Sequence, residues 1–595
     1  MLETGKKWIA CLIVVFVAVG IIFLTGVISP PSLMDDVDAV EAQIPHNMLA
    51  SGDWVTARIN GVIYLEKSPL EWWIIAATYK AFGTHDWAAR LPIAFTAIAL
   101  TLLTACFARW AFGNRAGLYS GLAMGTCIGL WLFTRILIPD VMLTFTVALA
   151  MWAFLRTQDG EEQRPFLWAC VLAASLALGF LLKSLVGIVF PIAAVLLYLL
   201  LTRQLLSREA WRRLHPWWAV VIFLVIAAPW HILATLRNPP YFAWTLRSEA
   251  GHYHGFLWFY FINEQLLRFL NLRYPRDYNT VPRLWFWLFH LIWLFPWTVY
   301  LPAVAKMNFR PVDRAGRARF LALCWVSFIL VFFTFSTTQE YYSMPCYPAF
   351  ALLLGSAMAT DEPWVRRGTR TLTVLSAAAC LAAITILIAV RHVPSPGDIT
   401  AALSRHPKVY SLSLGHMEDL TLDSFAYLRA PLALAALAFG IGALGTLRRK
   451  GMAAYLAAAA MMIVFFQGAQ LALIRFDPML SSRELATAII QGPPGGVIVD
   501  HHYYTFSSIA FYTGQPEILL NGRWNNFEYG SNAPGAPDVF IDDAKLAILW
   551  SQPRRYYLVA QADQLPRFTR ILGTDGFRIL KTSGGKIVLT NRPLG

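Results

Sequence analysis

The chain has 595 residues, of which 57% are hydrophobic and 14% are charged, and its mean hydropathy is +0.52. Soluble domains carry about 25% charged residues, so this composition excludes an ordinary soluble protein. The net charge of +14 suggests nucleic-acid binding, but Lys and Arg collect in short connectors between apolar runs. Such a distribution is typical of the cytoplasmic loops of membrane proteins. We therefore expect a polytopic membrane protein that binds no nucleic acid.

Apolar runs of roughly 18 to 25 residues recur along the chain, and each is long enough to cross the hydrocarbon core of a bilayer. They predict about thirteen transmembrane helices. The expected spans are 8–28, 88–112, 116–135, 141–157, 166–182, 185–202, 215–236, 284–306, 318–336, 343–360, 370–391, 430–447 and 452–474. The first run has no small-residue cleavage site before Pro30-Pro31, so we expect a retained helix and not a cleaved signal peptide.

Basic residues give the expected orientation of these spans. They cluster where each even-numbered span ends, for example at Arg208 and Arg212 after the sixth span and at Arg448 and Lys450 after the twelfth. Because positive charge is retained in the cytoplasm, the N-terminus should be cytoplasmic and the chain after the last span should be outside.

The segment 477–595 differs in composition from the rest. Gly492-Pro493-Pro494-Gly495-Gly496 indicates a turn, and a helix-like stretch covers 541–550. The strand-like runs are 497–499, 517–520, 556–559 and 586–589. We predict a transmembrane domain over 1–476, with periplasmic loops 29–87 and 237–283, and a periplasmic α/β domain over 477–595.

The first exterior loop carries two groups of charges. Asp36 and Asp38 have the DxD spacing of many sugar-nucleotide metal sites, but this spacing is also common in solvated loops and at helix N-caps. Glu66 and Lys67 are adjacent and follow Tyr64. Alternatively, they form an ordinary surface ion pair, which contributes little to the stability of the fold. Ionisable groups beside a membrane are nevertheless functional candidates by default.

Two further charges stand at span boundaries. Pro139 breaks a helix so that Asp140 can begin the next one, where its alternative role is helix capping. Lys183 lies between two long apolar runs, where a lysine can simply extend to the interface.

The later exterior segments add a second acid, a base and two phenols. Glu264 and Arg268 are four residues apart, so on a helix they share one face and can pair. Tyr341 and Tyr342 lie in a polar hairpin, where tyrosines often serve only as interfacial anchors. Together the cations on this side suit the phosphate of a lipid-linked donor.

Five blocks carry a family resemblance in the same order along the chain. They are "MDDVDAVEAQIPHNMLASGDWVTARINGVIYLEKSPLEWW", "TRILIPDVMLTF", "GFLLKSLVGIVFP", "FYFINEQLLRFL" and "FSTTQEYYSMPCYP". The chain thereby resembles the bacterial branch of the protein O-mannosyltransferase superfamily, and within it the 4-amino-4-deoxy-L-arabinose (lipid A) transferases. The fold this resemblance implies is an α-helical polytopic membrane protein of GT-C type with a small C-terminal α/β domain.

The resemblance also implies roles for individual residues. The catalytic carboxylates are Asp36 or Asp38 in the first loop and Asp140 in the second, and Glu264 and Tyr341 complete the site. The residues expected at the donor phosphate are Lys67, Arg268, Lys183, Tyr64 and Tyr342. Relatives often have a histidine near Asn263 or Gln265 that would join Glu66 around a metal, so the amides here weaken the case for a divalent metal ion.

The function implied is transfer of a sugar, by inverting displacement, from an undecaprenyl-phosphate-linked donor to lipid A phosphate or another periplasmic glycolipid. The resemblance implies a monomer in the bacterial inner membrane, surrounded by membrane lipid, with no firmly expected cofactor. A lipid or sugar transporter or flippase is the alternative, because it too has many spans and buried charges. Transporters usually contain internal repeats and broken helices at the membrane midplane, and the sequence has no convincing repeat.

Overall fold

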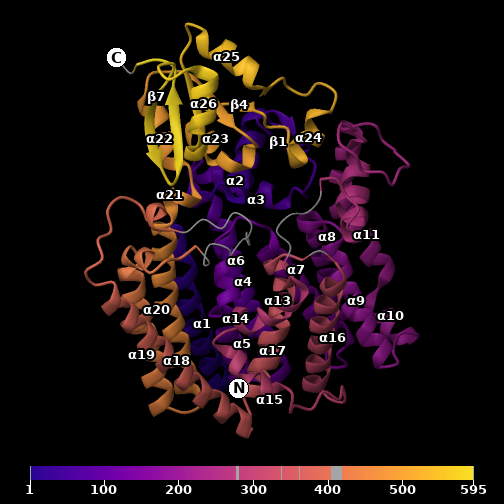
Figure 1. The fold of residues 1–595 in the computed structure, drawn as a ribbon. Coiled ribbons are helices and arrows are strands. Elements are labelled where there is room, and N and C mark those ends of the chain that lie inside the picture. The colour runs from indigo at the N-terminus through magenta and orange to yellow at the C-terminus, as the bar shows by residue number, and fades with distance from the viewer. Residues whose placement is uncertain (1, 276–280, 337, 361, 404–418, 594–595) are drawn as a thin grey trace.

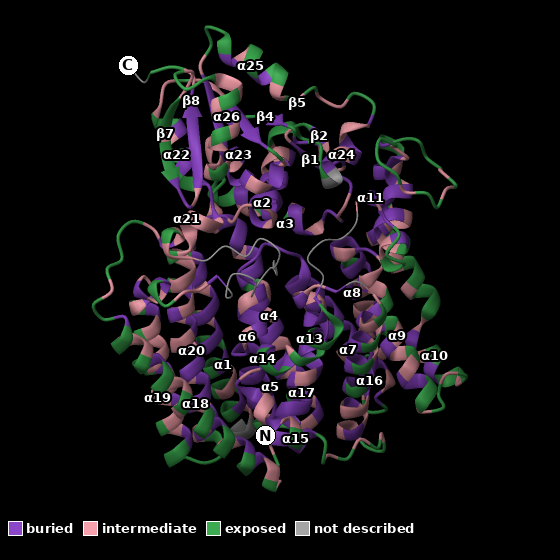
Figure 2. Ribbon diagram, in the orientation of Figure 1, coloured by how far each residue is buried: buried purple, intermediate pink, exposed green. Residues whose placement is uncertain are grey.

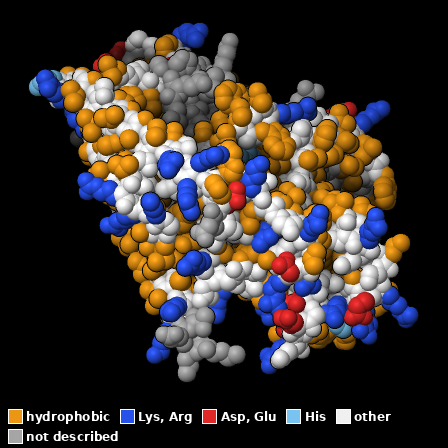
Figure 3. Space-filling view, turned by 90° about the horizontal axis from the view of Figure 1, so that it is seen from below, with side chains coloured by type: hydrophobic (Ala, Val, Ile, Leu, Met, Phe, Trp, Pro, Cys, Tyr) orange, Lys and Arg blue, Asp and Glu red, His pale blue; other side chains and the backbone are white. Residues whose placement is uncertain are grey.

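The computed structural model describes residues 2–275, 281–336, 338–360, 362–403 and 419–593. Helices stand side by side along one axis, and a sheet with short helices covers one end of them (Figure 1). The N-terminus lies at the opposite end, where Lys and Arg side chains outnumber acidic ones on the visible face (Figure 3).

Nine helices of the described chain are long and apolar enough to cross a membrane. They are α1 (Leu2–Ile28), α4 (Asp86–Phe112), α7 (Asp140–Gln158), α8 (Pro165–Lys183), α10–α11 (Arg208–Leu214 and Pro216–Arg237), α16 (Arg314–Phe335), α18 (Pro363–Ala389), α19 (Arg429–Arg448) and α20 (Met452–Arg475). A tenth span results if the bent pair Arg283–Trp293 and Trp297–Val304 is counted as one, although the chain turns by 95° between its halves. This pair comprises α13 (Arg283–Leu288), α14 (His290–Trp293), η2 (Trp297–Tyr300) and α15 (Leu301–Val304).

The roughly thirteen predicted spans all fall on helical segments of the described chain, and the nine or ten above are those long and apolar enough to cross a membrane by themselves. The three other predicted spans are helical, but each is short or interrupted. They correspond to α5 (Asn114–Gly125) with α6 (Ile128–Phe133), to α9 (Val186–Leu201), and to η3 (Glu340–Cys346) with α17 (Tyr347–Met358). An apolar run reports burial or lipid contact, not the continuity of the helix, so hydropathy alone could not locate these breaks.

The first exterior loop folds into a small unit beneath the sheet. It contains α2 (Val37–Ser51), the antiparallel pair β1 (Arg58–Ile59) and β2 (Val62–Ile63), and α3 (Leu70–Phe82). Helix α2 ends at Gly52, which adopts the left-handed conformation (φ 72°) and donates its N–H to the Met48 carbonyl. The second long loop, after α11, forms α12 (Gly255–Leu257) and the π-helix η1 (Trp258–Leu267).

Six strands in the described C-terminal region form one sheet in the order β5-β4-β3-β6-β8-β7. The strands are β3 (Gly496–Asp500), β4 (Glu517–Leu520), β5 (Phe540–Ile541), β6 (Tyr556–Gln561), β7 (Arg578–Ser583) and β8 (Lys586–Thr590). Strands β3 to β6 run parallel, and β8 pairs antiparallel with β6 and β7. The four predicted strands are confirmed, whereas β5 and β7 were not foreseen, because β5 has two residues and β7 is a largely exposed edge strand with few apolar residues.

Short helices accompany the sheet. They are α21 (Asp477–Leu480), α22 (Arg483–Gln491), η7 (Tyr503–Phe506), α23 (Ser508–Thr513), α24 (Asn525–Ser531), α25 (Asp543–Ser551), η8 (Ala562–Gln564) and α26 (Leu565–Leu572). Helix α25 confirms the predicted helical stretch, and the carboxylate of Asp542 caps it by accepting the N–H of Lys545 at 2.8 Å.

The first exterior loop and the sheet share one apolar core. Val40 and Ile44 of α2 and Trp72 of α3 pack in the same cluster as Val497 of β3 and Phe506 of η7. Buried residues accordingly run without a break from the helices into the sheet (Figure 2). The sheet therefore lies on the first loop, at the end of the helices where the predicted site residues are found.

Candidate active site

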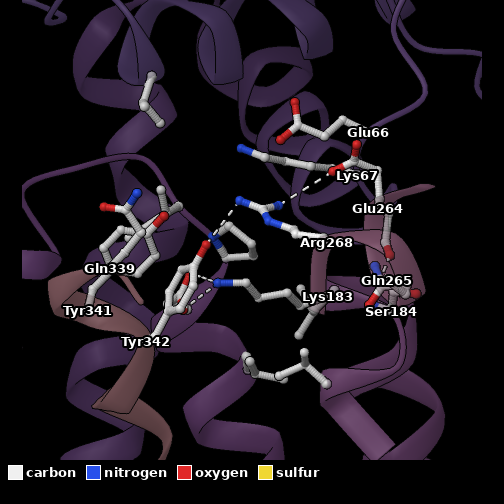
Figure 4. A pocket seen from close by; sticks show the side chains of 18 of the residues that line it. Glu66, Lys67, Lys183, Ser184, Glu264, Gln265, Arg268, Gln339, Tyr341 and Tyr342 are labelled. Atoms are coloured by element: carbon white, nitrogen blue, oxygen red, sulfur yellow. Dashed lines mark hydrogen bonds and ion pairs between the residues drawn. The ribbon is translucent and has the colours of Figure 1, made fainter. Parts of the chain in front are cut away.

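A cavity of about 290 Å³ lies where the helices meet the first loop and the C-terminal region. Ionisable side chains from segments far apart in the sequence, among them Lys67, Lys183 and Arg268, point into it (Figure 4). The described ionisable residues that line it are Asp36, Glu41, Tyr64, Glu66, Lys67, Asp140, Lys183, Tyr260, Glu264, Arg268, Arg273, Tyr341, Tyr342 and Tyr504. The structure thus brings together every predicted site residue except Asp38.

Asp140 and Lys183 meet because α7 begins and α8 ends on the same side of the molecule. The Lys183 ammonium lies 2.7 Å from both oxygens of Asp140. It also lies 5.1 Å and 4.9 Å from the ring centres of Tyr341 and Tyr342, within cation–π range. Within the described chain, the cap of α7 receives no side-chain hydrogen bond, so capping is not the role of Asp140.

Lys67 is held in the first loop by an acid that the sequence analysis did not single out. Its ammonium pairs with one oxygen of Glu41, and the indole N–H of Trp72 donates to the other oxygen at 2.6 Å. Burial alone would lower the pKa of Lys67, but the carboxylates of Glu41 and Glu66 raise it above its ordinary value. Lys67 therefore remains a cation at physiological pH.

Glu66 accepts a hydrogen bond of 2.6 Å from the phenol of Tyr64. Burial acts to raise the pKa of this carboxyl, but Lys67, Arg273 and Arg268 outweigh it and hold the pKa below the usual range. Glu66 is consequently ionised, and it adds negative charge beside Lys67.

The loop after η1 supplies two guanidiniums. Arg268 lies 3.5 Å from Glu264, as predicted from their spacing, and donates to the Tyr342 hydroxyl at 3.1 Å. Arg273 lies closer to the same Glu264 oxygen, at 2.5 Å. Burial raises the pKa of Glu264, and the two guanidiniums oppose this shift. Two cations thus share one carboxylate at this wall of the cavity.

The aspartates of the first loop do not converge. Asp36 lines the cavity, whereas the carboxylate of Asp38 accepts hydrogen bonds from Arg90 at 3.0 Å and from the Leu137 N–H at 2.9 Å. Asp38 is completely buried behind the cavity wall. Of the two aspartates that the sequence left as alternatives, Asp36 is the one that lines the cavity.

Asp36 is also distinguished by its ionisation. Burial raises its pKa to about 7, with Lys67 acting in the opposite direction and Glu66, Asp35 and Asp38 reinforcing the rise. A carboxyl with such a pKa is part ionised and part protonated at neutral pH, which suits a group that exchanges protons during a reaction.

Three ion pairs at this site share one arrangement. In the pairs Lys67–Glu41, Lys183–Asp140 and Arg268–Glu264 the cation side chain is 27–28% exposed, whereas its carboxylate is only 1–2% exposed. In Arg90–Asp38 both partners are buried, at 8% and 0%. The carboxylates of the first three pairs thus stand behind the cations, which face the cavity and can bind an anion.

One part of the cavity wall is apolar. Its described residues include Leu143, Leu182, Val186, Phe190, Phe269, Phe332 and Phe333. A ligand with an anionic head and a hydrocarbon tail would therefore find both of its parts matched within one cavity.

The residues around Glu66 do not form a metal site. Among the residues that the structure describes, there is no group of three or more His, Cys, Asp or Glu side chains placed to hold a metal ion. The neighbouring positions 263 and 265 carry amides, and Asn263 donates to the Tyr274 carbonyl at 3.0 Å. The donor set therefore does not fit the tentative metal role of Glu66.

The sequence analysis overlooked several residues of the cavity. Glu41 and Arg273 each pair with a predicted residue, and Tyr504 reaches the cavity from the C-terminal region. A signal for Glu41 existed, since it is a carboxylate on the face of α2 that also carries Val40 and Ile44. Nothing in the local sequence of Tyr504 marks its contact with a cavity whose other lining residues lie between positions 36 and 345.

Known proteins share parts of this sequence and this architecture. Residues 66–233 match the model of the dolichyl-phosphate-mannose-protein mannosyltransferase family. The crystal structure of ArnT from Cupriavidus metallidurans bound to undecaprenyl phosphate superposes with a TM-score of 0.76 at 23% identity, covering 99% of this chain and 98% of that one. The chain therefore has the GT-C type of fold that the resemblance implied.

The particular relatives are named undecaprenyl phosphate-alpha-4-amino-4-deoxy-L-arabinose arabinosyl transferases. The protein of Sodalis glossinidius is 28% identical over 59% of this chain and 58% of its own length. That of Pseudomonas fluorescens is 26% identical over 83% of this chain and 79% of its own. The match thus spans little more than half of the Sodalis protein, and the chain resembles these aminoarabinose transferases.

Proposed function

We propose that this chain is a glycosyltransferase that moves a sugar, most simply an amino sugar, from an undecaprenyl-phosphate-linked donor to the phosphate of lipid A. The observation that carries the proposal is the arrangement of Lys67, Lys183 and Arg268, which face a cavity that also has an apolar wall. The names of the relatives support the donor class. The acceptor, lipid A phosphate, follows from the family resemblance of the five sequence blocks.

The chemistry follows from the leaving group. An acceptor oxygen attacks the anomeric carbon from the face opposite to the donor phosphate, and the bond from that carbon to the phosphate oxygen breaks. The polyprenyl phosphate departs with the electron pair, and the configuration at the anomeric carbon inverts. This departure requires cations more than a general acid, because the anion is stable once its charge is neutralised.

The three cations divide this task by their geometry. Arg268 offers a planar fork that can bind two phosphate oxygens, while Lys67 and Lys183 act as point charges. The carboxylates behind them fix the direction of each cation before the donor arrives, so no reorganisation is needed when charge develops.

Asp36 and Asp140 serve the sugar and the acceptor. If the attacking group is an already ionised phosphate, no strong base is needed, and Asp36 with its pKa of about 7 can accept a proton from a singly protonated phosphate. Ionised carboxylates also attract the ammonium group of an amino sugar.

The location proposed is the bacterial inner membrane, with the cavity on the periplasmic side. The basic end of the helices supports this orientation, because Lys and Arg are retained on the cytoplasmic side. A transporter would place its site near the midplane at broken helices. Here the charged cavity lies at one end of the helices, against the first loop, which favours the transferase.

The test is a transfer reaction with the purified chain in proteoliposomes. Undecaprenyl-phosphate-linked aminoarabinose and lipid A are supplied, and lipid A is analysed by mass spectrometry. We expect lipid A to gain one sugar per modified phosphate, with none added when the donor is omitted and far less when Arg268→Gln replaces the wild type. Lipid A without its phosphates tests the acceptor group, and a donor with a neutral sugar tests the amine. If the folded wild-type protein leaves the donor unconsumed in every mixture that contains it, the proposal is contradicted.

A further inference from the structure

The side chain of Asp35 turns away from the cavity and into the C-terminal region. Its Oδ2 accepts hydrogen bonds from the Lys586 ammonium at 2.7 Å and from the Ser482 hydroxyl at 2.7 Å. Its Oδ1 accepts the Ser508 hydroxyl at 2.7 Å and the Ser508 N–H at 3.0 Å. All these donors come from residues more than 440 positions later in the chain. Both oxygens of Asp35 are therefore satisfied by one region.

The backbone around Asp35 is held by the same region. The Asp35 N–H donates to the Leu480 carbonyl at 2.8 Å, and the Asp36 N–H donates to the Tyr504 carbonyl at 2.7 Å. Ser32 donates its N–H to the Asp477 carboxylate at 2.7 Å. The segment that presents Asp36 to the cavity is thus fixed by residues of α21 and η7 and by a strand of the sheet (Figure 1).

Asp36 needs this support because of its backbone conformation. Its φ is 74°, a region that residues with a side chain rarely occupy. Such a conformation persists only where the surroundings impose it. Among the described residues, the Asp36 side chain makes no capping hydrogen bond to the helix it precedes. The contacts that fix Asp36 are therefore those to the C-terminal region.

Lys586 also neutralises a charge next to Asp36. Asp35 and Lys586 are 10% and 5% exposed, so water screens the pair only weakly. The other acid near Asp35 is Glu517 of β4, whose two oxygens have no hydrogen-bond partner among the described residues. Burial, reinforced by Asp35, holds the pKa of Glu517 well above its usual range, so Glu517 is uncharged. The Tyr503 phenol is the remaining titratable group beside them, and it too is uncharged, since burial raises its pKa.

We propose that the C-terminal region is a working part of the active site: Lys586, with Ser482 and Ser508, holds Asp35 so that Asp36 is positioned at the cavity. Lys586, Ser482, Ser508 and Asp35 are positioning residues. This inference rests on the proposed function, since it concerns the carboxylate that serves the transfer reaction. It assigns a role to a region whose own sheet contains none of the residues of the cavity wall predicted from sequence.

The charges around Asp36 determine how readily its carboxyl ionises. The charged groups facing Asp36 are Lys67 and Glu66 from the first loop, Asp38 from α2, and Asp35, which Lys586 balances. When Lys586 is replaced by methionine, Asp35 is left without its cation, and Asp36 becomes harder to ionise. The rate of transfer then falls, and the acidic limb of its pH profile moves to higher pH.

The experiment compares four proteins in the transfer assay across pH: wild type, Lys586→Met, Asp35→Asn with Lys586→Met, and Lys581→Met. Lys581 is a matched control, since it is a lysine of the same sheet in an exposed ion pair with Glu484. We expect Lys586→Met to lower kcat about tenfold and to shift the acidic limb upward. The double variant should restore the position of the limb, because the uncompensated charge is gone. Lys581→Met should match the wild type.

A role confined to folding of the sheet predicts a different result, since the double variant would then be as impaired as Lys586→Met. That outcome, or a wild-type kcat and pH profile in Lys586→Met, overturns the inference. Should Lys586→Met fail to fold, Ser482→Ala with Ser508→Ala removes two hydroxyl donors without changing charge. We expect that variant to lose kcat several-fold with an unmoved limb, and full activity in it would also overturn the inference. Failure of the proposed function would show separately, as no transfer by the wild type.

Discussion

The helices below the cavity and the layer at the end of them that carries the sheet bury polar groups in different ways. Within the helices, buried threonines satisfy themselves locally, as when Thr101 donates to the Ala97 carbonyl at 2.9 Å and Thr104 to the Leu100 carbonyl at 2.8 Å. At the end that carries the sheet, buried groups are carboxylates and cations paired across distant segments, such as Asp140 with Lys183. Ion pairs are expensive in hydrocarbon. Such pairs also occur at the other end of α7, as between Asp159 and Arg314, but those at the sheet end line one cavity, and this marks the candidate site.

A second contrast lies within that layer. Lys67, Lys183 and Arg268 keep about a quarter of their side-chain surface exposed, whereas Arg90 and Asp38 are closed off together. Pairs of the first kind can exchange a carboxylate contact for a phosphate contact. A pair of the second kind can only hold the first loop against the hairpin that carries Asp140. The contrast therefore separates binding residues from structural ones of the same chemical type.

The largest effect is expected for Arg268→Gln. Glu264 keeps Arg273 as a partner at 2.5 Å, so the change removes a cavity-facing cation without leaving a buried charge unpaired. The transfer rate should fall about 10²- to 10³-fold, the usual result of losing one donor that stabilises developing charge. Arg268→Lys should recover only part of this loss, because it restores the charge without the planar fork. An unchanged transfer rate for purified, folded Arg268→Gln would show that the partly exposed cations are not binding residues.

In contrast to Arg268→Gln, Asp38→Asn should lower the stability of the fold and leave the transfer rate nearly unchanged. Breaking a closed ion pair leaves Arg90 buried without its carboxylate and costs about 3–5 kcal/mol of stability. The folded fraction should retain its transfer rate within a few-fold, whereas Asp140→Asn should lose rate with a smaller change in melting temperature. Thermal melting in detergent together with the transfer assay distinguishes the two. Should Asp38→Asn instead lose transfer with unchanged melting, Asp38 acts at the site and the assignment to Asp36 is wrong.

The pH dependence sharpens the role of Asp36. Because burial raises its pKa to about 7, the ionised form increases as the pH rises through that value. If transfer uses the carboxylate, kcat/KM should rise with pH up to a plateau, with its midpoint near the pKa of Asp36. Lys67 lowers this pKa, so Lys67→Met should move the midpoint upward as well as slow the reaction. If kcat/KM does not change with pH within one unit on either side of the pKa of Asp36, Asp36 takes no part in proton transfer.

The smallest effect is expected at an ion pair of the same layer that lies outside the cavity. Arg237 and Asp53 lie 2.8 Å apart with side chains 52% and 26% exposed. Surface pairs of this kind contribute about 0–1 kcal/mol, so Arg237→Ala should leave the transfer rate unchanged and shift melting only slightly. A loss of rate comparable to that of Arg268→Gln would mean that any positive charge on this face supports transfer. The cations at the cavity would then have no particular role.

The sequence predicted the class of fold and most of the cavity. The helical spans, four of the strands and ten of the eleven proposed site residues agree with the structure in type or location. The prediction succeeded because a buried charge in an apolar chain is costly, so each one stands out. The choice between Asp36 and Asp38 stayed open at the sequence level, because spacing in a loop does not report which side chains turn in the same direction.

The rest depended on contacts that no local pattern records. Glu41 and Arg273 were missed since their importance comes from pairing with Lys67 and Glu264, and Lys586 since its partner Asp35 lies 551 positions earlier. The breaks between α5 and α6 and within α13 to α15 were missed because an apolar run stays apolar through a bend. Tertiary pairing and helix continuity are the two quantities that composition and periodicity leave undetermined.

The most direct test of the central claim is the affinity of the purified chain for undecaprenyl phosphate, compared between wild type and Arg268→Gln. The claim is that cations backed by buried carboxylates bind the phosphate of a lipid-linked ligand in the cavity. Loss of a hydrogen-bonded cation should raise Kd about 10- to 100-fold, while Arg237→Ala should leave Kd unchanged. Equal affinity for undecaprenyl phosphate in wild type and Arg268→Gln would contradict the claim.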